Sequence, residues 1–167
     1  MDLVLREGAF LGETHIVTGA AQGIGFAIAQ ALARHGAQVA MVDLDKGRLE
    51  EAKAKIQQAS VSPLIVQANV SAEGDVVRAV GEVLEASGCI NGLVNTAGIT
   101  RDARITKKSL ADFNLVLSVH LGGTFLFTRE VAVPAGGGSM TFWTSYDTEP
   151  AWDHLFVEAR SPGGDDW

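Results

Sequence analysis

Short apolar runs alternate with amphipathic segments over about the first 140 residues of the chain. The apolar runs predict strands at 14–18, 38–43, 63–68 and 90–95, with a fifth at 139–143. Between them, apolar residues recur every three or four positions, which places their side chains on one face of a helix. The four predicted helix faces are Ile24, Ile28, Ala31 and Leu32; Leu49, Ala52, Ile56 and Ala59; Val76, Val80, Val83 and Leu84; and Phe113, Val116, Leu117, His120 and Thr124.

Glycine, proline and serine residues support the boundaries of these predicted strands and helices. Gly36 is expected to end the first helix, Pro63 stands at the entry of the third strand, and Ser71 is expected to be a helix N-cap. The last helix is predicted from Ser109 to about Val133. Alternating strands and helices predict right-handed βαβ units and a parallel sheet covered on both faces. The predicted fold class is therefore α/β, a doubly wound parallel sheet (Rossmann) of about five strands that is incomplete and followed by an irregular C-terminal tail.

Composition excludes several classes of protein. The chain has 167 residues, 47% of them hydrophobic and 20% charged, which is typical of one globular domain with a core. Its net charge of −7 argues against nucleic-acid binding. Its uninterrupted apolar runs are too short for a membrane helix, and residues 3–5 are too few for a signal-peptide core. A single cysteine, Cys89, gives no disulfide framework and no metal-type cluster, so we expect a cytoplasmic protein without a metal.

The composition changes abruptly near Met140. Residues 141–167 hold six acidic residues against Arg160 alone, together with all three tryptophans and the only tyrosine. Two prolines and the pair Gly163-Gly164 interrupt any regular pattern there. We therefore predict two parts, a nucleotide-binding domain at 1–140 and an atypical, poorly ordered tail at 141–167. A frameshifted, alternatively read or truncated C-terminus and an evolved binding tail both account for this change.

A glycine-rich turn joins the first strand to the first helix. It reads Thr18-Gly19-Ala20-Ala21-Gln22-Gly23-Ile24-Gly25. In such a turn the first glycine permits a tight bend, the second lets the backbone approach a pyrophosphate, and the third allows the helix to pack closely on the strand. The helix N-terminus then presents free N–H groups to the phosphates. A turn that serves packing alone is the alternative.

Asp43 supplies the second half of a dinucleotide signature. It ends the second predicted strand, 18 residues after Gly25, where its carboxylate can accept hydrogen bonds from the adenosine ribose hydroxyls. The same carboxylate would repel a 2′-phosphate, and the turn offers Gln22 in place of an arginine. The predicted cofactor is therefore NAD in preference to NADP.

The turn TGAAQGIG resembles that of the short-chain dehydrogenase/reductase family, and further matches follow in order. Asn69-Val70 stands where the family usually has Asp-Val, and Asn95-Thr96-Ala97-Gly98 resembles its Asn-Asn-Ala-Gly. The segments 99–102 and 121–125 look like the 3-oxoacyl-carrier-protein reductase branch. The resemblance covers roughly residues 10–139 and implies hydride transfer between a nicotinamide and an alcohol or carbonyl carbon. It assigns cofactor contacts to Thr18, Gly19, Gln22, Gly23, Ile24, Gly25, Asp43, Asn69, Val70, Asn95, Ala97 and Gly98.

The catalytic part of the family pattern departs from this chain. The family uses Asn, Ser, Tyr and Lys; here His120 takes the Asn position and the Ser falls near Ser145. A histidine can relay protons, and an ordinary helix histidine is the alternative; Ser145 is otherwise a loop serine. The only tyrosine, Tyr146, is adjacent to Ser145 and is followed four residues later by Pro150 in place of lysine.

Two functions therefore stay open. The first is an NAD-dependent dehydrogenase/reductase by descent, acting on a small alcohol or carbonyl compound if active, with catalysis impaired or absent. The second is a non-catalytic nucleotide-binding or interaction module that pairs with full-length relatives, or with itself as a homo-oligomer, through the helix at 109–133.

Overall fold

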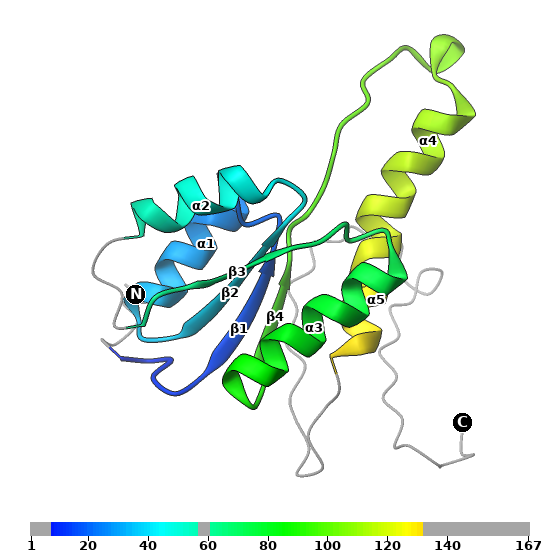
Figure 1. Ribbon diagram of the computed structural model, residues 1–167. Helices are drawn as coiled ribbons and strands as arrows, with labels where there is room; N and C mark the ends of the chain where they lie inside the picture. The colour runs from blue at the N-terminus through cyan, green and yellow to red at the C-terminus, as the bar shows by residue number, and fades with distance from the viewer. Residues whose placement is uncertain (1–7, 57–60, 132–167) are drawn as a thin grey trace, which may run out of the picture. The chain divides into compact units, whose positions relative to one another are not determined.

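The computed structural model describes residues 8–56 and 61–131 (Figure 1). The chain divides into two compact units, Met1–Ala132 and Val133–Trp167, and every described residue belongs to the first. The predicted fifth strand, the domain boundary at 140, the tail and Ser145 lie outside the described residues.

The described strands form one parallel sheet. They are β1 (Thr14–Thr18), β2 (Gln38–Asp43), β3 (Leu64–Gln67) and β4 (Gly92–Asn95), in the spatial order β3-β2-β1-β4. The order reverses at β1, which has β2 on one side and β4 on the other. Ligands of open α/β sheets bind at such a reversal, outside the carboxyl ends of the strands. The predicted doubly wound parallel sheet is confirmed.

The helices build a core on each face of the sheet. The first two are α1 (Gly23–Arg34) and α2 (Lys46–Lys55), whose buried residues form one apolar cluster with β1 and β2. The cluster on the other face combines the sheet with α3 (Glu73–Ser87) and α5 (Gly123–Glu130). Figure 1 shows α3 and α5 side by side, in agreement with their contacts.

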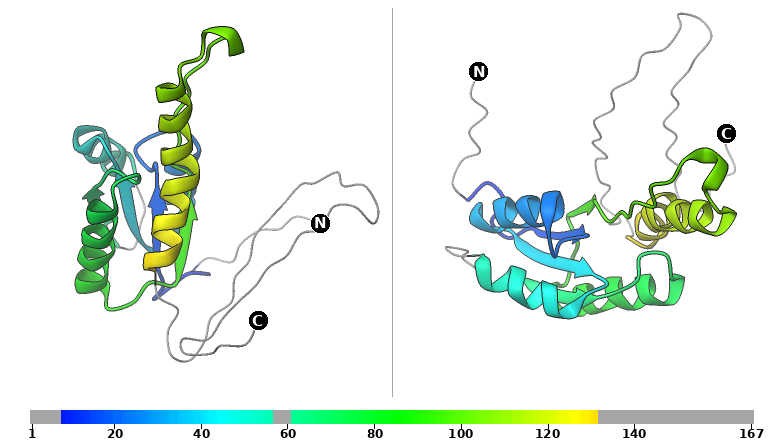
Figure 2. Two further views of the ribbon diagram at one scale, coloured as in Figure 1. Left: turned by 90° about the vertical axis from the view of Figure 1, so that its right-hand side faces the viewer. Right: turned by 90° about the horizontal axis from the view of Figure 1, so that it is seen from above.

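A long helix follows β4 after an extended segment and a 3-10 turn at Ile105–Lys107. It comprises α4 (Leu110–Leu117), a π-helical turn at Ser118–Gly122, and α5. The predicted helix is confirmed over Leu110–Glu130, and the π turn within it was not predicted. The left view of Figure 2 shows that α5 lies beside the strands, whereas α4 extends beyond them.

This 21-residue helix is also the one described segment that is long and apolar enough to cross a membrane, with a mean hydropathy of 1.4. Length and composition alone are a weak indication, because buried core helices of soluble proteins meet the same test; here 11% of the apolar window is buried. The helix contacts both α3 and β4, and Gly123 and Phe127 are buried there.

The predicted face of α1 is right for Ile28 and Leu32, which are half-buried against the core, and wrong for Ile24 and Ala31, which are exposed. Ile24 is 75% exposed, and the buried positions are Gly25, Ala29 and Ala33. Apolar residues surround most of α1, so periodicity alone did not select the buried side. The side with the smallest residues packs against the sheet because it allows the closest approach of helix to strand.

Other helix predictions need smaller corrections. Ala72, not Ser71, is the N-cap of α3, and the Ser71 hydroxyl donates instead to Asn69 Oδ1 at 2.8 Å. Leu84 is exposed, while Ala79 joins the buried face of α3. In α2, Leu49 and Ala52 are buried as predicted, but the helix ends at Lys55.

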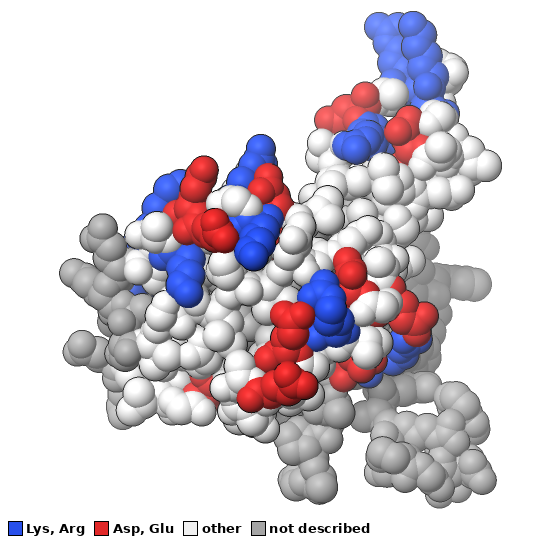
Figure 3. Space-filling model, in the orientation of Figure 1, with Lys and Arg blue, Asp and Glu red and all other residues white. Residues whose placement is uncertain are grey.

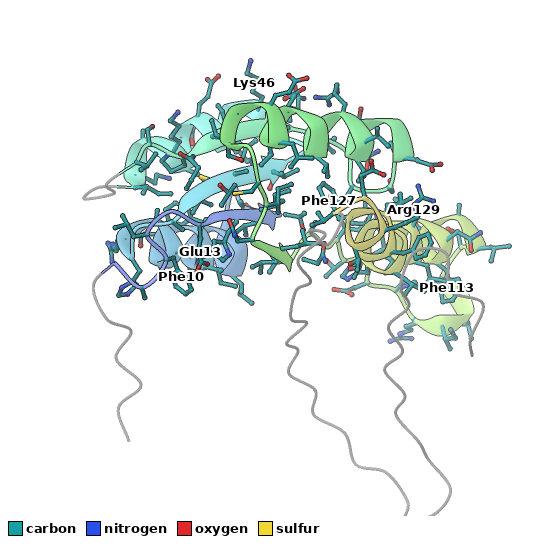
Figure 4. The ribbon with its side chains drawn as sticks, turned by 90° about the horizontal axis from the view of Figure 1, so that it is seen from below. Phe10, Glu13, Lys46, Phe113, Phe127 and Arg129 are labelled. Carbon is teal, nitrogen blue, oxygen red and sulfur yellow. The ribbon has the colours of Figure 1, made fainter. Side chains whose placement is uncertain are left out.

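The face predicted for the long helix is also wrong. Phe113 and Leu117 are exposed, and the buried residues are Gly123 and Phe127. Figure 4 shows Phe127 on the side of the helix toward the sheet and Phe113 on the side away from it. Phe113 and Leu117 belong to α4, which has no buried residue because it extends beyond the strands.

Candidate cofactor site

The glycine-rich turn lies at the carboxyl end of β1, as predicted. Gly19 has φ +67° and Gly23 has φ +58°, a conformation that side-chain-bearing residues rarely adopt. A Cβ at Gly19 would stand 2.8 Å from Ala97 Cα, so no side chain fits there, whereas one at Gly23 would meet nothing within 4 Å. Gly19 therefore serves packing, and Gly23 leaves an open surface over the start of α1.

The N-terminus of α1 has no side-chain cap. Gln22 is the N-cap residue, makes no capping hydrogen bond, and no acidic residue stands in the first turn. The N–H groups of a first helical turn have no intrahelical partner, and the helix dipole makes this end positive. The exposed Ile24 belongs to this turn. Together with the open space over Gly23, the uncapped end fits a phosphate group.

The Thr18 hydroxyl joins β1 to the segment that follows β4. Thr18 is buried, and its Oγ1 accepts hydrogen bonds from Thr96 N–H at 3.1 Å and Ala97 N–H at 3.2 Å. The Thr96 hydroxyl in turn donates to the Thr18 carbonyl. These bonds set the predicted residues Asn95, Ala97 and Gly98 beside the glycine-rich turn. The bridging role of Thr96 was not predicted, because partners 78 residues apart leave no local pattern.

Asp43 lies at the carboxyl end of β2 with its side chain toward the turn. Its Oδ2 accepts the Ala21 N–H at 3.1 Å, and its Oδ1 accepts the Asp45 N–H at 3.3 Å. A carboxylate has about four acceptor positions, so about two stay available after these bonds. The arrangement suits a group that presents two neighbouring hydroxyls.

The segment after β3 is fixed by side chains from α3. The Asn69 N–H donates to Asp75 Oδ2 at 2.9 Å, and this bond is the largest cause that lowers the pKa of Asp75 below its usual 3.8. Val70 is buried against α5, where a Cβ at Gly123 would stand 2.7 Å from Val70 Cγ2. The predicted residues Asn69 and Val70 thus lie at the same edge of the sheet as Asp43.

His120 lies in the π turn and contacts the segment after β4. Its Nε2 is 3.0 Å from Ile99 N and 2.9 Å from Ile99 O. One nitrogen cannot do both at once, so Nε2 accepts from the N–H in one tautomer and donates to the carbonyl in the other. A Cβ at Gly98 would stand 2.6 Å from the ring, so a side chain there would displace His120. His120 therefore holds the loop 96–99 against the long helix, a contact that the sequence did not reveal.

A comparison with protein families matches residues 13–154 to the short-chain dehydrogenase model. The chain is 36% identical over 156 residues to a D-threitol dehydrogenase of Mycolicibacterium smegmatis, covering 92% of this chain and 60% of the relative. It is 33% identical over 155 residues to a 5-keto-D-gluconate 5-reductase of Escherichia coli K12, covering 91% and 61%.

Solved structures give the same result. A citronellol catabolism dehydrogenase of Pseudomonas aeruginosa PAO1 aligns with a TM-score of 0.72 and 35% identity, over 78% of this chain and 54% of that one. An NAD⁺-bound xylitol dehydrogenase aligns with a TM-score of 0.70 and 32% identity, over 73% and 47%.

A parallel sheet with a glycine-rich turn at its switch point and an acidic residue at the end of the neighbouring strand defines a nucleotide-binding protein of the Rossmann type. The chain belongs to the short-chain dehydrogenase/reductase family of oxidoreductases, which use nicotinamide cofactors. It spans about 60% of the length of the curated relatives described above. The open turn at Gly23, the uncapped start of α1 and the available acceptors of Asp43 fit such a cofactor, which when bound would supply the nicotinamide that carries a hydride.

Proposed function

We propose that the chain binds NAD(H) and prefers it to NADP(H). The observation that supports this most strongly is the Asp43 carboxylate, held by the Ala21 and Asp45 N–H groups with acceptor positions to spare. In this proposal the ribose hydroxyls donate to Asp43 and the pyrophosphate lies over Gly23 at the start of α1. Two adjacent anions repel, so a 2′-phosphate beside Asp43 weakens binding.

Calorimetric titration of the full chain with NAD, NADH, NADP and NADPH tests the preference. We expect NAD to bind at least tenfold tighter than NADP, and Asp43→Ala to narrow that ratio. Asp102→Ala, which removes an exposed acid from the segment before α4, is the matched control and is expected to leave the ratio unchanged. Equal or tighter NADP binding by the unaltered protein overturns the proposal.

We propose further that catalysis is impaired or absent. The sequence has no Tyr-x-x-x-Lys pair, and acid/base assistance of this kind is worth ~10²–10⁴-fold in rate. Alcohols, polyols and ketones of the kind that the relatives' names indicate are the substrates to try. We expect no turnover above background. A robust rate that disappears in His120→Ala or Ser145→Ala contradicts this and identifies a different proton relay.

A second candidate function is an interaction module that pairs through the helix 110–130. Four side chains at i, i+4 spacing along this helix are exposed and apolar: Phe113, Leu117, Leu121 and Phe125. The occupant that we propose is a second copy or a full-length relative offering the same face. Sedimentation of the purified chain is expected to show a dimer that Leu121→Glu dissociates, while Val77→Glu on the exposed side of α3 leaves it intact. A monomer at tens of micromolar that also fails to sediment with a full-length relative rules this candidate out.

The setting that we propose is the cytoplasm, since the sequence has a single cysteine and relatives of this family are generally soluble. Imaging the tagged full chain tests this directly, and a membrane-bound pool contradicts it.

A further inference from the structure

A basic side chain from α2, Arg48, contacts the glycine-rich turn. Asp45 is the N-cap of α2, and its Oδ1 accepts the Arg48 N–H at 3.1 Å. Its Oδ2 lies 3.4 Å from the Nε of the same arginine. One carboxylate therefore contacts both the backbone and the side chain of Arg48, which favours a guanidinium position close to the start of α2.

The far end of Arg48 meets the glycine-rich turn. Its Nη1 donates to Gln22 Oε1 at 3.2 Å. Gln22 directly follows Ala21, whose N–H holds Asp43 Oδ2. The guanidinium and the Asp43 carboxylate thus attach to neighbouring residues of one turn, and the ribose hydroxyls are expected between α2 and that turn.

Arg48 has binding capacity to spare. A guanidinium carries five N–H groups in a planar fork that matches phosphate oxygens. Among the described residues, its partners are Asp45 and Gln22, and its Nη2 takes part in neither contact. The Arg48 side chain is 60% exposed, so an entering ligand can reach it. Figure 3 shows basic and acidic side chains close together over the α2 region.

We infer that Arg48 is a specificity-determining residue of this site: it binds a phosphate on the 2′ oxygen of the adenosine ribose and thereby offsets part of the repulsion from Asp43. This inference rests on the proposed nucleotide binding. It adds an attraction between Arg48 and the 2′-phosphate to the repulsion from Asp43. In this inference Asp43 makes NADP a weaker ligand than NAD, and Arg48 keeps the binding of NADP strong enough to be measured.

The test compares Arg48→Met with Lys55→Met, both measured by calorimetry in the full chain. Both substitutions remove one positive charge from α2, but Lys55 lies seven residues further on, about 10 Å along the axis. That distance is about a Debye length at 0.1 M salt, so Lys55 controls for net charge. The ligands are NAD, NADP, 5′-AMP and adenosine 2′,5′-bisphosphate, with melting curves to establish folding. Each substitution is also placed in the Asp43→Ala protein, where NADP binds more tightly.

We expect Arg48→Met to weaken NADP and the bisphosphate about tenfold, the size of a lost charge-assisted contact at an exposed site. NAD and 5′-AMP should change less than twofold, and Lys55→Met should leave the NAD to NADP ratio unchanged. Arg48→Lys should restore part of the loss, since it keeps the charge without the fork.

The inference is overturned if Arg48→Met and Lys55→Met change the ratio equally, or if Arg48→Met weakens NAD and NADP alike. It is also overturned if NADP does not bind even the Asp43→Ala protein. These outcomes leave NAD binding by the unaltered chain intact. Failure of the proposed function itself is a different result, in which no nucleotide binds the unaltered chain.

Discussion

At the scale of single residues, the site depends on a few positions where an added side-chain atom would clash with its neighbours. The third glycine of the turn shows this best. A Cβ at Gly25 would stand 2.6 Å from Thr96 Oγ1 and closer than 3.0 Å to the Gly19 carbonyl oxygen. Both groups belong to the contact between β1 and the segment after β4. A shift that removed the clash would therefore move the glycine-rich turn.

Gly25→Ala is therefore predicted to lower the free energy of unfolding by about 1–3 kcal/mol, the usual cost of overpacking. Gly81→Ala in α3 is the control, because a Cβ there meets nothing within 4 Å. That change should stabilise the protein by about 0.5–1 kcal/mol through helix propensity. Urea unfolding measures both, and equal effects would contradict the packing argument.

Thr18 is a second residue on which the site depends, because its hydroxyl accepts hydrogen bonds from two backbone N–H groups at once. Thr18→Val keeps the shape and removes the acceptor, which leaves partly buried donors without a partner. We expect a loss of about 2 kcal/mol in the free energy of unfolding. Thr18→Ser retains the hydroxyl and should lose less than half as much. If the two variants unfold at the same urea concentration, the hydroxyl does not have this role.

At the scale of elements, the start of α3 carries a pH-dependent contact. The Asn69 N–H and then Arg78 lower the pKa of the Asp75 carboxyl. A lowered pKa in the folded state stabilises above the unfolded pKa, 3.8, and this is lost as pH falls through the lower folded value.

Asp75→Ala should therefore destabilise the protein at pH 5–7, and the difference from the unaltered protein should shrink below about pH 4. Glu85→Ala, an exposed acid on the same helix, is the control and should show no such trend. Urea unfolding from pH 3 to pH 7 measures this. A difference that grows toward low pH would have the wrong sign.

The π turn of the long helix is the second element with a specific role, because it carries His120 against Ile99. His120→Leu removes both the donor and the acceptor, so we expect the Ile99 amide to lose protection from hydrogen exchange. His120→Asn should keep it, since an amide side chain also donates and accepts. Loss of protection in both variants would mean that the ring itself, and not its hydrogen bond, holds the loop.

At the scale of the whole molecule, ligand binding and folding are linked. A ligand that binds only the folded state stabilises it by about 2.7 kcal/mol at 100 times its dissociation constant. NAD at that concentration should raise the free energy of unfolding of the full chain by this amount. Asp43→Ala should reduce the gain at the same NAD concentration. If NAD does not stabilise the chain and calorimetry detects no NAD binding, the proposed cofactor site is contradicted.

The sequence by itself determined the class of fold, and it predicted the glycine-rich turn and the Asp43 carboxylate that the structure brings together. The two apolar runs at 14–18 and 38–43 are the observed β1 and β2. They were recognisable because a strand buried on both faces needs an almost continuous apolar run. The turn and Asp43 were readable since their spacing is local. The long helix after β4 was predicted within three residues at its C-terminal end.

Only the tertiary structure decided which sides of the helices are buried and which distant groups meet. Apolar residues surround most of α1, so the closeness of approach at Gly25 and Ala29 selected its buried side. The hydrogen bonds of Thr18 with Thr96, of His120 with Ile99 and of Arg48 with Gln22 join segments 21 to 78 residues apart. Such contacts depend on how strands and helices are placed in space, and no local spacing records them.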